Sequence, residues 1–462
     1  MSGLTPAQVF ASVAGVVGVL VVVVTPPFQV PDEPNHFARA FQISEGQVVS
    51  QRIAGSVGGW LPRSIDEVAD TVMGRVPFNP DVKQDLDAWA RAFDIPLLPQ
   101  DRIETIFPNT ALSGPVAYLP QALGIELGRP LGVSALALFY WGRFSSLFWC
   151  VAITALAIRW LTVRPWTCVL LALLPMTLYV RSSLSSDGPT LALTVLAMAI
   201  CLRPIALEPR DGHLARSRNE SADRRQWWLL FGVAALMALG KPPYGAVVFL
   251  ALATPPRLVG GMKRYIAMTL ALTTVFVVAQ GGWALAMRGL TAVMAPGSDP
   301  EAQWAYLVDN PGDAVAVLAQ DLIRSAPALA HQAVGVLGWL DAPLPGLVAV
   351  ILGVLIVLVA LGEPGPPSAC AAFGWLGAAI CGVGTLTLLA LNYLWWTPPR
   401  AVHVEGIQGR HLLPLIPFLF LSLNPPVRIA RPLARVRPLL VIMFIVVSAT
   451  TTLLTVFDRY YG

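Results

Sequence analysis

Charged residues are scarce in this chain of 462 residues, because Asp, Glu, Lys and Arg together make up only 13% of it. Soluble domains usually carry about 25% charged residues, so this composition excludes an ordinary water-soluble protein. Hydrophobic residues make up 55% of the chain, and the mean hydropathy is +0.65. These values predict an all-α, polytopic transmembrane protein.

Cysteine and recognisable nucleotide-binding motifs are also lacking. All five cysteines lie in apolar runs, which indicates neither a disulfide framework nor a metal-binding motif. No basic stripe is interleaved with aromatic residues, so a nucleic-acid partner is not expected despite the net charge of +4. The longest predicted cytoplasmic loop, 203–226, has no P-loop or glycine-rich fingerprint, and no nucleotide-binding domain is expected there.

Apolar stretches long enough to cross a bilayer predict about eleven membrane spans. Nine lie near 7–24, 134–158, 165–182, 188–202, 265–287, 345–361, 369–392, 411–424 and 438–457. A longer run, 227–256, is interrupted by the sequence GKPP at 240–243, and we divide it into two short helices because proline ends a helix. The first run is interpreted as an uncleaved span, since no Lys or Arg precedes it and no small-residue cleavage site follows.

The distribution of basic residues predicts the orientation. With the N-terminus inside, the cytoplasmic loops contain 15 Lys and Arg against 5 acids, whereas the outer segments contain 15 against 22. Short basic loops stay cytoplasmic, so the N-terminus is expected inside and the C-terminus outside. Residues 1–462 then form one integral membrane domain. Its two large external segments are 25–133 and 288–344, and the second is expected to be helical from about Asp313 to Leu340.

Polar side chains gather at the helix ends that this topology brings to the outer face. They are Asp32, Glu33, His36 and Arg39 after the first span, Arg143 within the second, Arg181 and Asp187 between the third and fourth, Lys241 and Tyr244 at the divided run, and Gln408, Arg410 and His411 before the tenth. Because helix ends that meet the same surface can converge, we expect these groups to line one cavity.

The expected chemistry of this set is group transfer. A pair of acids at a membrane surface is a costly arrangement unless it is used, and a carboxylate can deprotonate an acceptor hydroxyl. Arg and Lys can bind a phosphate and stabilise it as it leaves. Nucleotide sugars are absent outside the cytoplasm, so the donor is expected to be a sugar on a polyprenyl phosphate. Asp32 is the preferred base, and one base suffices for inversion.

Simpler structural roles stay open for the same residues. Asp32 can be a helix N-cap, with Glu33 in the first helical turn. Lys241 and Arg181 can extend to lipid headgroups, and Asp187 can cap the fourth span. The aromatic pairs 395–396 and 460–461 are interpreted as interfacial belts rather than as sugar platforms.

The motifs PPFQVPDE at 26–33, with His36 after it, and GIQGRHLLP at 406–414 resemble a bacterial membrane family known as a domain of unknown function. That family is similar to the GT-C glycosyltransferases. Weaker marks are GRF at 142–144, SSD at 185–187, KPPY at 241–244 and GVLGWLD at 335–341, so the resemblance covers about 20–425. This chain has His411 where tyrosine is commoner in the family.

The resemblance implies a GT-C-like core in the bacterial plasma membrane, with an acid of the first external loop as base. That residue corresponds to Asp32 first and to Glu33 second. The donor would be a polyprenyl-phosphate sugar, and the acceptor an envelope glycan or lipid. Some GT-C enzymes use a divalent metal, but no second acidic ligand group is evident, so no cofactor is expected. The alternatives are a transporter or flippase of lipid-linked glycans and a non-catalytic scaffold of a glycan-assembly complex.

Overall fold

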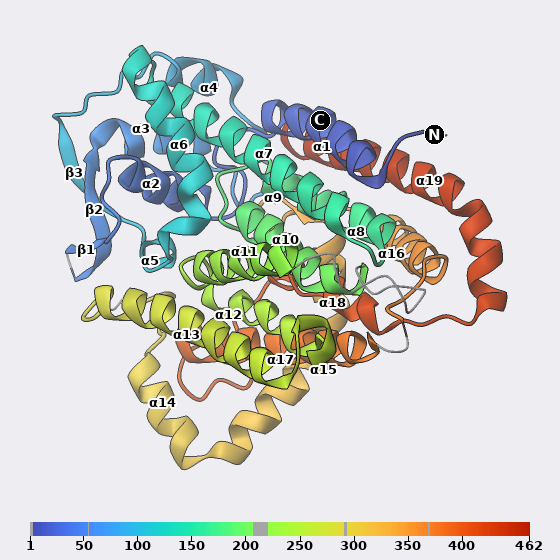
Figure 1. Ribbon diagram of the computed structural model, residues 1–462. Coiled ribbons are helices and arrows are strands. Elements are labelled where there is room, and N and C mark those ends of the chain that lie inside the picture. Colours follow the sequence, from blue (N-terminus) through green and yellow to red (C-terminus); the bar gives the residue numbers. More distant parts are fainter. Residues whose placement is uncertain (1–2, 54, 207–219, 291–292, 368–369) are drawn as a thin grey trace.

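The computed structural model describes residues 3–53, 55–206, 220–290, 293–367 and 370–462, and it is predominantly helical. It has two parts (Figure 1): a body of long apolar helices, and a smaller lobe that joins the ends of several of them. We call residues 33–128 the N-terminal lobe. The all-α membrane architecture expected from the composition is confirmed.

The first helix, α1 (Pro6–Val24), shows how the sequence defines a span. Its N-terminus is closed by a capping box in which Thr5 and Gln8 satisfy each other's backbone N–H groups. An uninterrupted apolar run follows, and the helix ends before two consecutive prolines. α1 packs against α7 (Ala135–Trp160) and α19 (Val427–Tyr460), and the three run side by side in Figure 1.

Within the described residues, five helices are long and apolar enough to cross a membrane. They are α1, α7, α13 (Met262–Ala286), α17 (Ala372–Trp395) and α19. The apolar helix α16 (Gly346–Leu361) is shorter. The predicted count of about eleven spans is therefore not confirmed.

Proline explains why two of the predicted spans are not continuous helices. The stretch 165–182 forms α8 (Pro165–Ala172) and α9 (Pro175–Arg181), because Pro175 cannot continue α8. The stretch 411–424 forms the short turns η6 (Gly409–Leu412), α18 (Ile416–Leu419) and η7 (Phe420–Ser422).

The run 227–256 is broken where its prolines predict. α10 (Asp187–Ala206) and α11 (Glu220–Ala238) precede the break. Lys241 then stands in extended conformation before α12 (Pro242–Gly245), and the 3-10 turns η3 (Ala246–Ala253) and η4 (Pro256–Val259) follow. This places Lys241 at a helix end instead of on a helix face.

The N-terminal lobe has its own apolar core, which includes Phe37, Phe41, Val57 and Leu61. Its helices are α2 (Glu33–Ser44), α3 (Arg63–Met73), α4 (Leu86–Ala92), α5 (Pro108–Ala111), η1 (Pro115–Tyr118) and α6 (Leu119–Gly128), and the short η2 (Arg129–Leu131) leads on to α7. An antiparallel sheet of β1 (Gln51–Ile53), β2 (Ser56–Pro62) and β3 (Arg102–Ile106), in that order, covers one side.

The segment 288–344 is also largely structured. α14 (Pro300–Asp309) and α15 (Pro311–Gly335) form the V-shaped projection at the bottom of Figure 1. α15 begins close to the predicted start at Asp313, but it ends at Gly335, where a hairpin of β4 (Val336–Leu337) and β5 (Ala342–Pro343) replaces the expected last helical turns.

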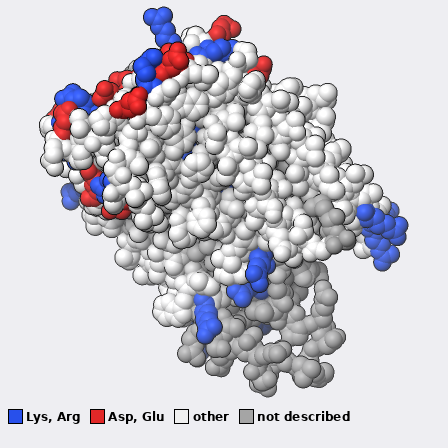
Figure 2. Space-filling model, turned by 90° about the horizontal axis from the view of Figure 1, so that it is seen from above, with Lys and Arg blue, Asp and Glu red and all other residues white. Residues whose placement is uncertain are grey.

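Charge is distributed unevenly over the molecule. Figure 2 shows acidic side chains, mixed with basic ones, over the end formed by the N-terminal lobe. At the N-terminal end of α19, the visible charged side chains are basic. The polar lobe and the basic helix end therefore lie at opposite ends of the apolar body.

Candidate functional site

A cavity of about 450 Å³ lies where the N-terminal lobe meets the ends of the long helices. Its walls come from segments far apart in sequence. One is the turn that follows α1, and another is α5 together with the residues after it. The junctions before α10 and before α12 also contribute. The last turns of α17 and the segment leading into η6 complete it. The polar and charged lining residues are Asp32, His36, Asn109, Thr110, Ser113, Tyr118, Ser186, Asp187, Lys241, Tyr244, Asn392, Gln408, Arg410 and His411.

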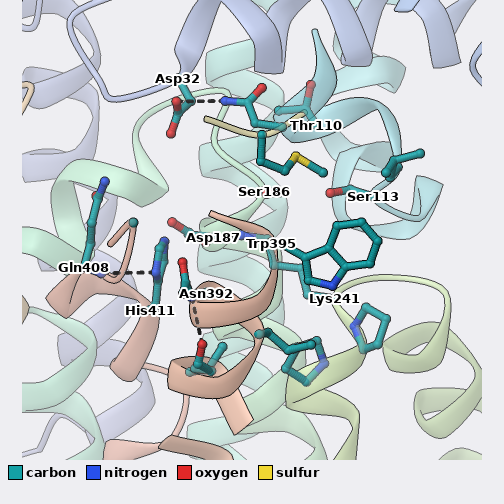
Figure 3. Close-up of a pocket in the computed structure, with 18 of the residues that line it drawn as sticks. Asp32, Thr110, Ser113, Ser186, Asp187, Lys241, Asn392, Trp395, Gln408 and His411 are labelled. Carbon is teal, nitrogen blue, oxygen red and sulfur yellow. Dashed lines mark hydrogen bonds and ion pairs between the residues drawn. The ribbon is translucent and has the colours of Figure 1, made fainter. Parts of the chain in front are cut away.

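Asp32 lies at the rim of this cavity, where two donors from different segments hold its carboxylate; Figure 3 shows one of these interactions as a dashed line. Asn109 Nδ2 donates to Asp32 Oδ1 at 2.9 Å, and Arg410 Nη2 donates to Asp32 Oδ2 at 2.9 Å. Asn35 Nδ2 in turn donates to Asn109 Oδ1 at 2.6 Å, which fixes the orientation of that amide. The Asp32 side chain is still 30% exposed, so the carboxylate remains accessible from the cavity.

The backbone at Asp32 is strained. Its φ of 64° lies in the left-handed region, which costs roughly 1–2 kcal/mol for a residue with a Cβ, although Asp tolerates it better than most. Asp32 occupies the N-cap position of α2, but its side chain makes no capping hydrogen bond. Helix capping therefore does not explain why an acid stands here.

Asp187, the first residue of α10, lies deeper in the cavity and contacts both of its cations. Lys241 Nζ forms a hydrogen-bonded ion pair with Asp187 Oδ1, and Arg410 Nε lies 3.5 Å from Asp187 Oδ2. Arg410 thereby bridges the two aspartates. We call Asp32, Asp187, Lys241 and Arg410 the four-charge cluster, and its two acids and two cations balance each other.

His36 is a neutral group beside this cluster. Its Nδ1 lies 2.8 Å from the hydroxyl oxygen of Tyr118, and both side chains are buried. Burial lowers the pKa of His36 from 6.5 to about 3, with the nearby acids Asp32 and Asp187 opposing the shift and Lys241 and Arg410 adding to it. Burial also raises the pKa of Tyr118. Both rings are therefore uncharged hydrogen-bonding groups at neutral pH.

Glu33 does not line the cavity, although it is adjacent to Asp32. Its carboxylate is fully buried against Arg143, with Arg143 Nη2 2.6 Å from Glu33 Oε2 and Nε 2.9 Å from Oε1. It also accepts from the backbone N–H groups of Phe28 and Leu184, both at 3.1 Å. Arg143 donates further to the carbonyls of Val22, Thr25 and Pro26. This pair fixes the turn after α1 and leaves no room for a substrate.

Two other predicted site residues, Arg39 and Arg181, are also placed away from the cavity. Arg39 is buried in the N-terminal lobe, where it donates to Gln42, Ser50 and the carbonyls of Val48 and Ser113. Arg181 is buried behind the site. Its guanidinium donates to the carbonyl of Ala172 and lies 5.2 Å from the centroid of the Phe10 ring. The expectation that all the polar helix-end residues share one cavity is wrong for Glu33, Arg39, Arg143 and Arg181.

The motif at 406–414 and the break at 240–243 meet in the cavity wall. The Tyr244 hydroxyl donates to the carbonyl of His411 at 2.8 Å, and the backbone N–H of Gln408 donates to His411 Nδ1 at 3.3 Å. η6 is pressed against α15, because the N–H of Gly409 donates to Gln332 Oε1 at 2.8 Å. These contacts aim Arg410 into the four-charge cluster.

Several lining residues were not expected from the sequence. Asn109, Thr110, Ser113 and Tyr118 come from the far end of the N-terminal lobe, some 80 residues after Asp32. Leu388, Leu391, Asn392 and Trp395 lie at the spacing of one helical face of α17. This helical spacing is the one feature of the sequence that could have identified the α17 residues as part of the site.

At least one residue of each aromatic pair makes contacts within the protein. Trp395 and Trp396 line the cavity, and Figure 3 shows Trp395 beside Lys241. Tyr460 is buried, and its hydroxyl donates to the carbonyl of Gln29.

The cavity is poor in metal ligands. Among the residues that the structure describes, no group of three or more His, Cys, Asp or Glu side chains could hold a metal ion. Both cavity carboxylates are instead paired with cations. Such a site can polarise a hydroxyl at Asp32 and attract an anion at Lys241 and Arg410.

The helical body, its apolar spans and this charged cavity define an integral membrane protein. The chain belongs to the family described as "Predicted membrane protein (DUF2142)", whose model matches residues 16–419. That match covers both end motifs and every residue of the four-charge cluster. No curated protein and no solved structure matches the chain.

Proposed function

We propose that this protein is a glycosyltransferase that moves a sugar from a polyprenyl-phosphate carrier to an extracytoplasmic envelope glycan or lipid. The observation that carries the proposal is an accessible carboxylate, Asp32, in the same cavity as Lys241 and Arg410. A base beside two phosphate-binding cations is what such a transfer needs.

The proposed reaction is one inverting displacement. Asp32 takes the proton of an acceptor hydroxyl as that oxygen attacks C1 of the donor sugar. The bond from C1 to the phosphate oxygen breaks, and the polyprenyl phosphate leaves with the electron pair. Lys241 and Arg410 stabilise the charge on the departing phosphate. His36, neutral and hydrogen-bonded to Tyr118, can orient the acceptor hydroxyl without competing for its proton.

The proposed location is the bacterial plasma membrane, with the N-terminus cytoplasmic and the cavity facing outward. The basic N-terminal end of α19 supports this orientation, because short segments rich in Lys and Arg stay inside. A donor that reaches an outward-facing cavity at the membrane surface must arrive through the lipid.

Charge placement argues against a transporter of lipid-linked glycans. Such a protein needs polar groups along the whole path through the membrane. Here the four-charge cluster gathers at helix ends, and the buried pair of Arg143 with Glu33 is closed by its own contacts. A non-catalytic scaffold gives no reason for an accessible, strained Asp32.

The test replaces Asp32 in cells that lack the chromosomal copy of the gene. Asp32→Asn keeps the shape of the side chain but removes the base, so envelope glycans should match those of the deletion strain. Asp32→Glu, which keeps the charge but moves it by one methylene, should retain partial function. A normal glycan profile from Asp32→Asn at wild-type membrane level would overturn the assignment and favour a scaffold.

A further inference from the structure

Asp187 occupies the place in the cavity where an incoming phosphate would find its two cations. Its side chain is 6% exposed, and its two carboxylate oxygens face different partners. Oδ1 is bound by Lys241 Nζ, and Oδ2 lies 3.5 Å from Arg410 Nε. A phosphate oxygen that engaged both cations would have to share or take over these contacts.

Arg410 has an unused donor at this point. Its side chain is 5% exposed, and its Nε–H has no hydrogen-bond acceptor among the described residues, since it does not point well enough at Asp187 Oδ2, 3.5 Å away, to form a hydrogen bond. A buried donor without an acceptor is costly. Because Arg410 lines the cavity, its Nε–H is available to an acceptor atom of a ligand bound there.

Because the four-charge cluster is already neutral, a phosphate at this position would compete with a carboxylate of the cluster for the two cations. Two acids already neutralise the two cations, so a phosphodiester would bring an unbalanced negative charge into a largely buried site. It can bind well only if the cations turn from a carboxylate to the phosphate. Asp32 is needed as the base, which leaves Asp187 as the carboxylate to be displaced.

We propose that Asp187 is an internal counter-ion that holds Lys241 and Arg410 in the empty site and competes with the donor phosphate for them. This inference rests on the proposed function, because it assumes a phosphate-linked donor. It assigns the phosphate position to the space between Lys241 Nζ and Arg410 Nε. Asp187 thus has a role distinct from that of Asp32. Its contacts with Lys241 and Arg410 break when the donor binds, and they form again when the polyprenyl phosphate departs.

The experiment measures binding of farnesyl phosphate to the purified full-length protein in detergent, by titration calorimetry, with farnesol as the uncharged control ligand. Asp187→Asn should bind farnesyl phosphate about tenfold more tightly than wild type, because the internal competitor has lost its charge. Lys241→Gln should bind it about tenfold more weakly. Farnesol affinity should be unchanged in both. Asp341→Asn is the matched control, since it alters a buried Asp–Arg pair away from the cavity.

Equal or weaker binding by a monodisperse Asp187→Asn variant would overturn the counter-ion role. If that variant does not stay monodisperse, the same comparison is made between Lys241→Gln and the double variant Lys241→Gln/Asp187→Asn, which should bind more tightly than the single one. Suppose that wild type binds farnesyl phosphate and that Lys241→Gln binds it more weakly, but that Asp187→Asn does not bind it more tightly. This result would overturn the counter-ion role of Asp187 and leave the donor assignment standing. Absence of farnesyl phosphate binding in wild type defeats the donor assignment as well.

Discussion

Adjacent residues of identical charge have opposite surroundings in this protein. Asp32 lies at the cavity rim with a 30% exposed side chain, whereas Glu33 is fully buried against Arg143. The sequence indicates that both are acids after the first span, and it favours Asp32. It cannot show the direction of each side chain, because the left-handed backbone at Asp32 is what turns the two carboxylates apart.

The pair of Glu33 with Arg143 is expected to be structural. Removing one partner of a buried ion pair leaves the other uncompensated and costs about 3–5 kcal/mol. Glu33→Gln should therefore lower the thermal transition of the purified protein substantially, while Glu104→Gln, a change at an exposed acid, should not. An unchanged transition in Glu33→Gln would show that the pair does not stabilise the turn after α1.

His36 should make stability depend on pH. Its pKa is about 3 in the folded protein and 6.5 ordinarily, so below pH 6.5 the unfolded chain binds a proton that the folded chain does not. The stability that this provides is complete above pH 6.5 and is lost as the pH falls toward 3, by about 2 kcal/mol at pH 5. The thermal transition of His36→Gln should fall less between pH 7 and pH 5 than that of wild type. Equal falls would contradict the burial of a neutral His36.

At the scale of elements, the site depends on where helices end. Asp187, Lys241 and Arg410 were predicted to converge with Asp32 because each stands at a helix end on the same face, and all four line the cavity. The contributions of α5 and α17 were not predicted, since their approach depends on the packing of the N-terminal lobe and of α15. The same reasoning is wrong for Arg181, because its guanidinium donates to the carbonyl of Ala172 and lies against the Phe10 ring instead of facing the cavity.

Gly409 forms a close contact between η6 and α15. A Cβ added there would lie 2.2 Å from the carbonyl oxygen of Leu329 and 2.4 Å from the backbone nitrogen of Ala333. Gly409→Ala should therefore push η6 away and move Arg410 out of the cluster, so farnesyl phosphate affinity should fall several-fold. Gly382→Ala on α17, where a Cβ meets nothing within 4 Å, should bind like wild type. Equal affinities for the two variants would show that η6 does not depend on this contact.

At the scale of the whole molecule, composition was enough to predict an all-α membrane protein. The number of spans was not, because 3-10 turns and proline breaks divide apolar runs that look continuous in sequence. The sequence predicts an external loop at 25–133, whereas residues 33–128 form a folded lobe whose sheet depends on pairing between strands about 45 residues apart.

The orientation can be tested by labelling with a membrane-impermeant maleimide in intact cells. Four of the five native cysteines are buried and the fifth is half-buried, so the background should be low. Glu104→Cys in the N-terminal lobe should react from outside, and Arg431→Cys at the basic end of α19 should react after lysis alone; both native residues are exposed. The reverse labelling pattern would place the cavity on the cytoplasmic side. It would then remove the reason for expecting a lipid-linked donor, because nucleotide sugars are present there.

Catalysis by Asp32 is tested by following the donor lipid itself. The full-length protein in nanodiscs is incubated with the lipid extract of its own membranes and an acceptor fraction, and polyprenyl-phosphate sugars are quantified by mass spectrometry. Wild type should deplete one such lipid and release polyprenyl phosphate in equal amount, whereas Asp32→Asn should leave it intact. Equal depletion by wild type and Asp32→Asn, or depletion by neither, would contradict transfer with Asp32 as the base.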